Sequence, residues 1–123
     1  MKPSEYIKQA KRTEPKTYKF RKTGEVTPRI EHAVMGIVTE AGELMDSIKK
    51  AKIYGQKLDK TNLIEELGDI MWYIALLTDE LSTSFEEIWY KNIKKLKVRY
   101  PKKYTDKKAK KRNLQKERAH LEK

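Results

Sequence analysis

The 123-residue chain has no cysteine, only two histidines and no long apolar run. The lack of cysteine excludes disulfides, thiolate metal sites and cysteine nucleophiles. Two histidines also argue against a histidine-rich zinc site. Because no run of 18 apolar residues exists, we expect no membrane span. The first 13 residues lack the apolar stretch of a signal peptide, which predicts a cytoplasmic protein. Any chemistry must therefore depend mainly on carboxylates and basic side chains.

Charge is distributed unevenly along the chain, whose net charge is +11. Residues 1–30 carry a net charge of +6, residues 31–90 carry −7 and residues 91–123 carry +12. An acidic centre between basic ends suits a metal site beside a site for a polyanion. An ordinary soluble domain with a solvated basic tail would have the same distribution. Charge alone leaves both interpretations open.

The spacing of apolar residues predicts an all-α protein with a single domain. We expect a short N-terminal helix capped by Ser4, then three long helices that begin after Thr27, near Asn62 and after Ser84. Pro101 should end the last of these, and the basic segment that follows should be partly ordered at most. Apolar residues recur every three or four positions and predict one buried stripe on each of the first two long helices: Ile30, Val34, Ile37, Ala41, Leu44 and Ile48, then Leu63, Leu67, Ile70, Ile74, Leu77 and Leu81. These elements predict a helical bundle of three long helices plus a short one.

Trp72 lies away from the main stripe of its helix. A large apolar ring on a second helical face usually needs a second partner. We therefore expect the bundle to be completed by oligomerisation, with Trp72 near the interface.

Two pairs of carboxylates stand out on consecutive predicted helices. Glu40 and Glu43 are three residues apart, as are Glu66 and Asp69, so each pair shares a helical face beside the buried stripe. Four acids can converge only around a positive charge, because they would otherwise repel one another strongly. Oxygen ligands without histidine or cysteine favour Mg²⁺, or alternatively Mn²⁺. The spacing predicts a metal site, although acids three residues apart are also common on ordinary helix surfaces.

Other polar residues lie on faces where a ligand could bind. His32 shares the flank of Glu40 and Glu43, where it either contacts a ligand or serves as a structural hydrogen-bonding group. Tyr73 shares the face of Glu66 and Asp69 and either orders a ligand or packs. The last long helix carries a polar ribbon of Asn92, Lys95 and Arg99, which suits a triphosphate but equally suits a solvated basic face.

Three segments resemble one known family. RIEHAVMGIVTEAGELMDSIKK, NLIEELGDIMWYIALL and NIKKLKVRYPKKYT are similar to the MazG-like nucleoside triphosphate pyrophosphohydrolases, from about Arg29 to Tyr104, and EYIKQAKRTE resembles the start of small phage and bacterial members. The paired motif E-x-x-E and E-x-x-D on successive helices is the most specific part. One departure is Thr39, where many members have a glutamate.

The resemblance implies an activity and roles for the residues. It implies cleavage of nucleoside triphosphates between the α and β phosphates, a helical bundle that is a dimer or a dimer of dimers, and an enzymatic domain at 1–104 followed by a basic tail at 105–123. Glu43, Glu66 and Asp69 would chiefly hold Mg²⁺, while Glu40 would ligate it or orient the attacking water. Phosphates would be bound by residues at the family's basic and amide positions: Asn92, Lys95, Arg99 and, in the tail, Arg112.

Two other classes of function remain open. The basic tail could bind the phosphate backbone of a nucleic acid, although it has few aromatic residues for stacking on bases. A non-catalytic helical interaction protein is the second alternative, but it would leave the four acids without a role. Neither class requires pyrophosphate release that depends on magnesium.

Overall fold

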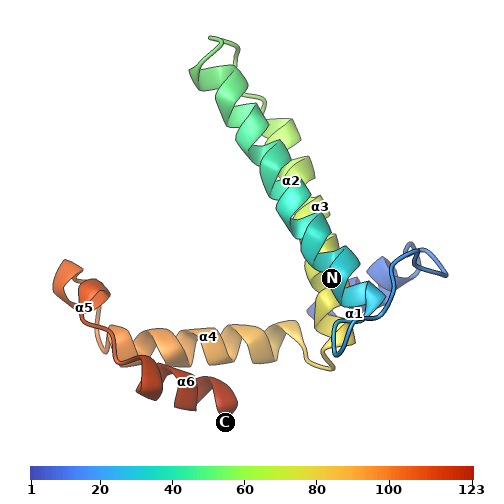
Figure 1. The fold of residues 1–123 in the computed structure, drawn as a ribbon. Helices are drawn as coiled ribbons and strands as arrows, with labels where there is room; N and C mark the ends of the chain where they lie inside the picture. Colours follow the sequence, from blue (N-terminus) through green and yellow to red (C-terminus); the bar gives the residue numbers. More distant parts are fainter. The chain divides into compact units, whose positions relative to one another are not determined.

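A computed structural model describes all 123 residues and contains six helices. They are α1 (Pro3–Lys11), α2 (Pro28–Lys52), α3 (Lys60–Glu80), α4 (Phe85–Arg99), α5 (Asp106–Lys110) and α6 (Leu114–Glu122), as drawn in Figure 1. One isolated bridge, Thr23 to Val26, is the only β pairing. The all-α prediction is confirmed. No helix has both the length and the apolar character that crossing a membrane requires.

The chain forms two compact units, which are described separately. Residues 1–83 contain α1, α2 and α3, and residues 84–123 contain α4, α5 and α6. In the first unit, α2 and α3 are long helices that pack against each other as a hairpin, and α1 packs against α3 (Figure 1). The predicted division between an enzymatic domain and a basic tail at residue 104 concerns function, and it stays a prediction.

Side-chain caps explain where most helices begin. The hydroxyl of Thr27 accepts a hydrogen bond from the Ile30 amide at 3.2 Å, and Ser84 caps α4 in the same way, as predicted. The predicted cap by Ser4 is wrong: α1 begins at Pro3, two residues before the start that this cap implies, and has no side-chain cap. Proline fits this position because its fixed φ angle suits a first turn and its missing N–H would be unpaired there anyway.

An ion-pair network joins the segment after α1 to the base of the hairpin. Arg29, near the start of α2, contacts Glu14 at 2.7 Å, Asp79 at 2.6 Å and Glu80 at 3.3 Å. Lys11 at the end of α1 also contacts Asp79, at 3.2 Å. Burial would raise the pKa of Asp79, but its hydrogen bonds from Arg29 and Lys11 outweigh that effect and lower it. The network therefore fixes α1 and its loop against α2 and α3.

The core within one chain is small. Ala33, Ala75 and Leu76 are fully buried in the hairpin. Several residues that the sequence predicts to be buried are instead exposed: Val34, Ile48, Leu67 and Leu81. Within one chain the predicted stripes are not buried at these positions, because two helices cover only one arc of each other and leave the rest of a wide apolar face uncovered.

Trp72 has its partners within the chain. Its indole N–H donates to the Thr13 hydroxyl at 2.8 Å, and its ring packs edge-on against His32 and Tyr73. These contacts within one chain do not test the prediction that Trp72 lies near an oligomer interface, and it stays a prediction.

In the second unit, α6 packs against α4 (Figure 1). Glu117 on α6 has 2% of its surface exposed, and its carboxylate contacts Arg99 on α4 at 2.9 Å and Arg112 at 2.8 Å. This buried ion pair gives the basic segment an ordered structure with two helices, where the sequence predicted partial order at most. The predicted end of α4 before Pro101 is confirmed.

Candidate metal site on the hairpin of α2 and α3

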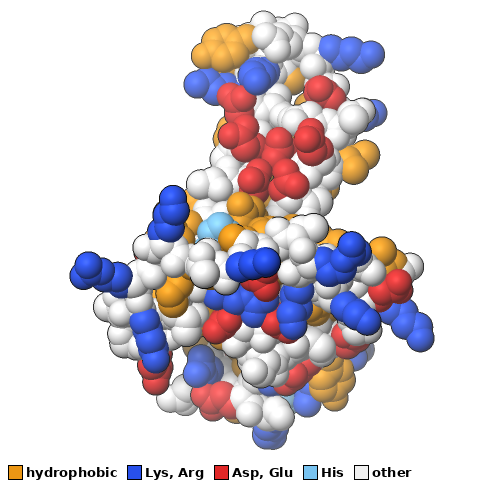
Figure 2. Space-filling view, turned by 90° about the vertical axis from the view of Figure 1, so that its right-hand side faces the viewer, with side chains coloured by type: hydrophobic (Ala, Val, Ile, Leu, Met, Phe, Trp, Pro, Cys, Tyr) orange, Lys and Arg blue, Asp and Glu red, His pale blue; other side chains and the backbone are white.

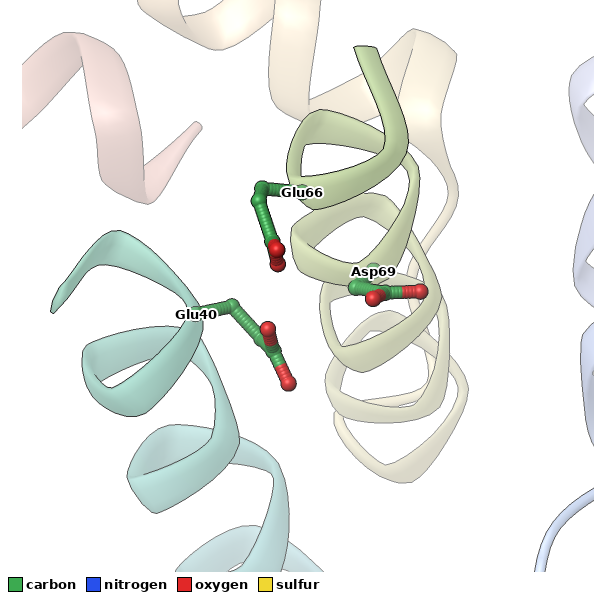
Figure 3. A group of neighbouring side chains, drawn as sticks. All are labelled: Glu40, Glu66 and Asp69. Carbon is green, nitrogen blue, oxygen red and sulfur yellow. The ribbon is translucent and has the colours of Figure 1, made fainter. Parts of the chain in front are cut away.

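Three carboxylates converge between the two long helices. Glu40 comes from α2, while Glu66 and Asp69 come from successive turns of α3 (Figure 3). One oxygen from each lies within 4.8 Å of the others. Figure 2 shows acidic side chains gathered into one patch over the hairpin, in the upper part of the view. The geometry is that of a group which can hold a divalent cation through hard oxygen ligands.

The electrostatics of this group match a cation site. The pKa of Glu40 is raised, first by its hydrogen bond with Glu66, then by burial and by the negative charges of Asp69, Glu66 and Glu43. Burial and the charges of Glu40 and Asp69 likewise raise the pKa of Tyr73. A cation among these oxygens would offset the repulsion that raises both pKa values.

Glu66 is oriented by a chain of polar side chains that the sequence reasoning missed. It has only 8% of its surface exposed. The Asn62 side-chain amide donates to Glu66 at 3.1 Å, and the Ser47 hydroxyl donates in turn to the Asn62 carbonyl oxygen. Asn62 lies four residues before Glu66, about one helical turn away, and this spacing is the signal that could have identified it. Such a chain fixes which way the carboxylate points, as second-layer hydrogen bonds do around metal ligands.

Glu43, the fourth predicted ligand, lies outside this group. It is exposed on α2 and lines a cavity of about 340 Å³ together with Asp46, Ser47, Lys50, Gln56, Lys57, Asp59 and Asn62. Its charge still contributes to the raised pKa of Glu40. The structure therefore brings together three of the four predicted acids and leaves Glu43 beside them.

His32 and Tyr73 belong to an aromatic cluster next to the acids. The ring centroid of His32 lies 4.9 Å from that of Tyr18 and 5.5 Å from that of Tyr73. Tyr73 also packs directly on Gly36, where an added Cβ would overlap the ring. Both predicted ligand residues have a packing role in the structure. Tyr73 is also close enough to the carboxylates for their charges to raise its pKa.

The predicted phosphate-binding residues lie in the second unit and fall into two groups. Arg99 and Arg112 share the carboxylate of Glu117, whose pKa their hydrogen bonds lower to about 2. Lys95 forms no ion pair, and Asn92 is exposed. Sequence reasoning missed Glu117, which looked like one acid in a basic tail. Two of the four candidates are thus engaged by an internal anion.

Comparisons with known proteins identify the family of the chain. The model of the MazG nucleotide pyrophosphohydrolase domain matches residues 29–104, a range that includes all the converging carboxylates. The gene 37 protein of Mycobacterium phage L5 is 33% identical over 75 residues, which cover 57% of this chain and 65% of that protein. The match thus spans a little under two thirds of the phage protein's length. No solved structure matches. Since the family model covers more than half of the sequence, the chain belongs to the MazG nucleotide pyrophosphohydrolase domain family.

Proposed function

We propose that the protein hydrolyses nucleoside or deoxynucleoside triphosphates to the monophosphate and pyrophosphate, with Mg²⁺ as its cofactor. The observation that carries the proposal is the convergence of Glu40, Glu66 and Asp69 from two helices inside the region that matches the family. Carboxylate oxygens without sulfur or nitrogen ligands favour Mg²⁺, with Mn²⁺ as the natural substitute. When bound, such an ion neutralises phosphate charge and acidifies water.

The surroundings of each acid suggest whether it would act as a metal ligand or as the base. Glu66 is nearly buried and is held by Asn62, so it suits a fixed ligand. Asp69 lies one turn further along α3 and completes the pair. Glu40 is partly exposed and comes from α2, opposite the pair on α3, which suits a base that orients water and takes its proton as the α phosphorus is attacked. Glu43 is proposed as an additional ligand that reaches the group from its exposed position.

The remaining candidates would bind the substrate. Lys95 has no internal anion and is available for phosphate, together with the amide of Asn92. Arg99 and Arg112 could bind phosphate only if they exchange the Glu117 carboxylate for it, since both guanidinium groups are already paired. His32 and Tyr73 would border the nucleoside beside the carboxylates.

A homodimer or homotetramer would complete the fold. Large apolar side chains remain exposed along both long helices: Val34, Met35, Val38, Met45, Ile64, Leu67 and Met71. Exposed apolar side chains of this size, repeated along two packed helices, are typical of an interface. A second hairpin would bury it and could line the substrate site from the other side.

Pyrophosphate release from a panel of common NTPs and dNTPs, with and without Mg²⁺, tests the proposal. We expect activity that needs the metal and is lost in Glu66→Gln. The matched control Glu65→Gln removes the same charge from the neighbouring position, which lies outside the converging group, and should keep activity. Absence of turnover with every nucleotide would contradict the proposal and favour a nucleic-acid-binding or non-catalytic role.

Hydrolysis in ¹⁸O water identifies the bond that is broken. Label in the nucleoside monophosphate supports attack at the α phosphorus. Label in pyrophosphate indicates attack at the β phosphorus. Orthophosphate with a nucleoside diphosphate would show that the proposed reaction is wrong.

A further inference from the structure

The second unit holds nearly all of the net charge of the chain. Residues 84–123 contain 15 basic and five acidic side chains, a net charge of +10 out of +11. Concentrated charge of one sign attracts anions but does not by itself make a site. A site needs a concave surface on which the charges converge.

Such a surface lies between α4 and α6. A cavity of about 300 Å³ is lined by three lysines, one histidine and two apolar residues: Lys94, Lys97, Lys116, His120, Val98 and Pro101. Lys94, Lys97 and Val98 share one face of α4, while Lys116 and His120 are one helical step apart on α6. Two helices thus present cations to the same hollow.

The basic side chains around the contact between α4 and α6 fall into two groups. The arginines are neutralised, because Glu117 is buried between Arg99 and Arg112. The three lysines of the cavity form no ion pair with any residue of the chain. Lys94 lies over the Tyr90 ring, 5.2 Å from its centroid, which leaves its charge uncompensated by any anion. Three lysines that line one hollow without a counter-charge repel one another, and an anion bound there would relieve this repulsion.

His120 adds an unsatisfied polar group to the same cavity. Its Nδ1 is buried and has no hydrogen-bond partner. Buried polar atoms are almost always paired, so an unpaired one often marks a missing partner. Val98 and Pro101 add apolar surface to the lining of the hollow, against which the aliphatic stems of the lysines can pack.

We propose that this cavity is a second anion site, which binds a phosphate-bearing ligand through Lys94, Lys97 and Lys116 without a metal. Its residues all belong to the second unit, and it uses none of the residues assigned above to the triphosphate. Its ligand carries at least two negative charges, because a single charge would leave most of the repulsion among the lysines in place. Free pyrophosphate and the backbone of a single-stranded nucleic acid share this chemistry.

Binding of inorganic pyrophosphate to the full chain tests the site, measured by calorimetry in EDTA and at about 20 mM salt, where screening is weak. EDTA removes any metal and so prevents binding at the carboxylates. The double variant Lys97→Gln and Lys116→Gln should weaken binding by about fivefold or more, because two exposed charge pairs are lost. The matched control, Lys107→Gln with Lys110→Gln, removes the same charge from α5 and should change binding by less than about twofold.

A ten-nucleotide single-stranded DNA in the same titration distinguishes the two sources of phosphate. Selective weakening of either probe by the cavity variant supports the site and names its ligand. Equal weakening by the two variants would mean diffuse attraction to the basic unit and would overturn the proposal. So would the failure of both probes to bind at millimolar concentration. Because EDTA is present throughout, either result is independent of whether the protein hydrolyses triphosphates.

Discussion

Removing one carboxylate from the converging group should stabilise the protein when no metal is present. In Glu40→Gln, the repulsion of Glu40 by Glu66 and Asp69 disappears, since their oxygens approach within 4.8 Å. Two unit charges about 4 Å apart repel by ~1 kcal/mol in water and by ~4 kcal/mol near a protein surface. Because Glu40 is partly exposed, we take the lower end and expect a gain of about 1–2 kcal/mol in the free energy of unfolding at pH 8.

Magnesium should reverse the order of stability. A ligand that binds only the folded state stabilises it by ~2.7 kcal/mol at a concentration of 100 Kd. Wild type should gain this stabilisation, and Glu40→Gln should gain little, because one of three converging ligands has lost its charge. The melting temperature of wild type should therefore be below that of Glu40→Gln in EDTA and rise above it as Mg²⁺ is added.

Thermal unfolding followed by circular dichroism, in EDTA and in a Mg²⁺ series, measures both effects. A gain of 1 kcal/mol in the free energy of unfolding corresponds to a rise of about 4–8 °C in the melting temperature of a unit the size of residues 1–83. Glu65→Gln is the matched control, and it should shift little in either condition. If Glu40→Gln melts below wild type in EDTA, or if both respond equally to Mg²⁺, the three acids do not form a cation site.

Three further predictions concern packing, charge and assembly. Gly36→Ala should destabilise the hairpin by about 1–2 kcal/mol because its Cβ would overlap Tyr73, whereas Gly42→Ala, which meets open space in the same helix, should stabilise it by about 0.5–1 kcal/mol. Free energies of unfolding from chemical denaturation that change in the same direction for both variants would contradict this. Because hydrogen bonds from Arg112 and Arg99 lower the pKa of Glu117 to about 2, its ion pairs should stabilise the fold fully above pH 4.5 and lose this effect as the pH falls toward 2. The free energies of unfolding of wild type and Glu117→Gln should therefore converge over that range, and a constant difference between them would refute the prediction. Wild type should be at least a dimer by light scattering and Ile64→Glu a monomer, because Ile64 is 71% exposed on the apolar face; a monomeric wild type at micromolar concentration would exclude the interface.

The helices were the part of the fold most open to prediction. Threonine and serine before apolar runs located the starts of α2 and α4, because a side-chain oxygen at that position pairs an otherwise free amide. Ser4 misled the prediction for α1, since Pro3 is an equally good first residue and allows the helix to begin before it. Local signals thus predict that a helix exists more reliably than they predict its first residue.

Burial could not be predicted from periodicity in the same way. The pattern identified the apolar face of each helix, but Leu67 is 53% exposed while Ala33 and Ala75 are fully buried. The pattern contains no information about how many partners a helix has. Where one partner is present, only the centre of the apolar arc is covered, and small residues that allow close approach occupy that centre.

The candidate site was predictable where it depended on spacing and unpredictable where it depended on distant contacts. Spacing on each helix placed Glu66 and Asp69 on one face and Glu40 on the facing helix, and these are the acids that meet. Spacing equally favoured Glu43, because the positions of residues on one helix do not show which turn of the facing helix lies opposite them. The ion pair between Arg112 and Glu117 could not be predicted from spacing, because it forms only where α6 folds back on α4.

The small core of the hairpin has a thermodynamic consequence for the proposed enzyme. Ala33, Ala75 and Leu76 bury little apolar area, and the clustered acids oppose folding by repulsion. A bound cation and a second copy would each offset one of these terms, and both would bind only the folded hairpin. Stability would then depend on the concentrations of metal and protein together, so that the catalytic centre, the interface and the folded state form in one cooperative step.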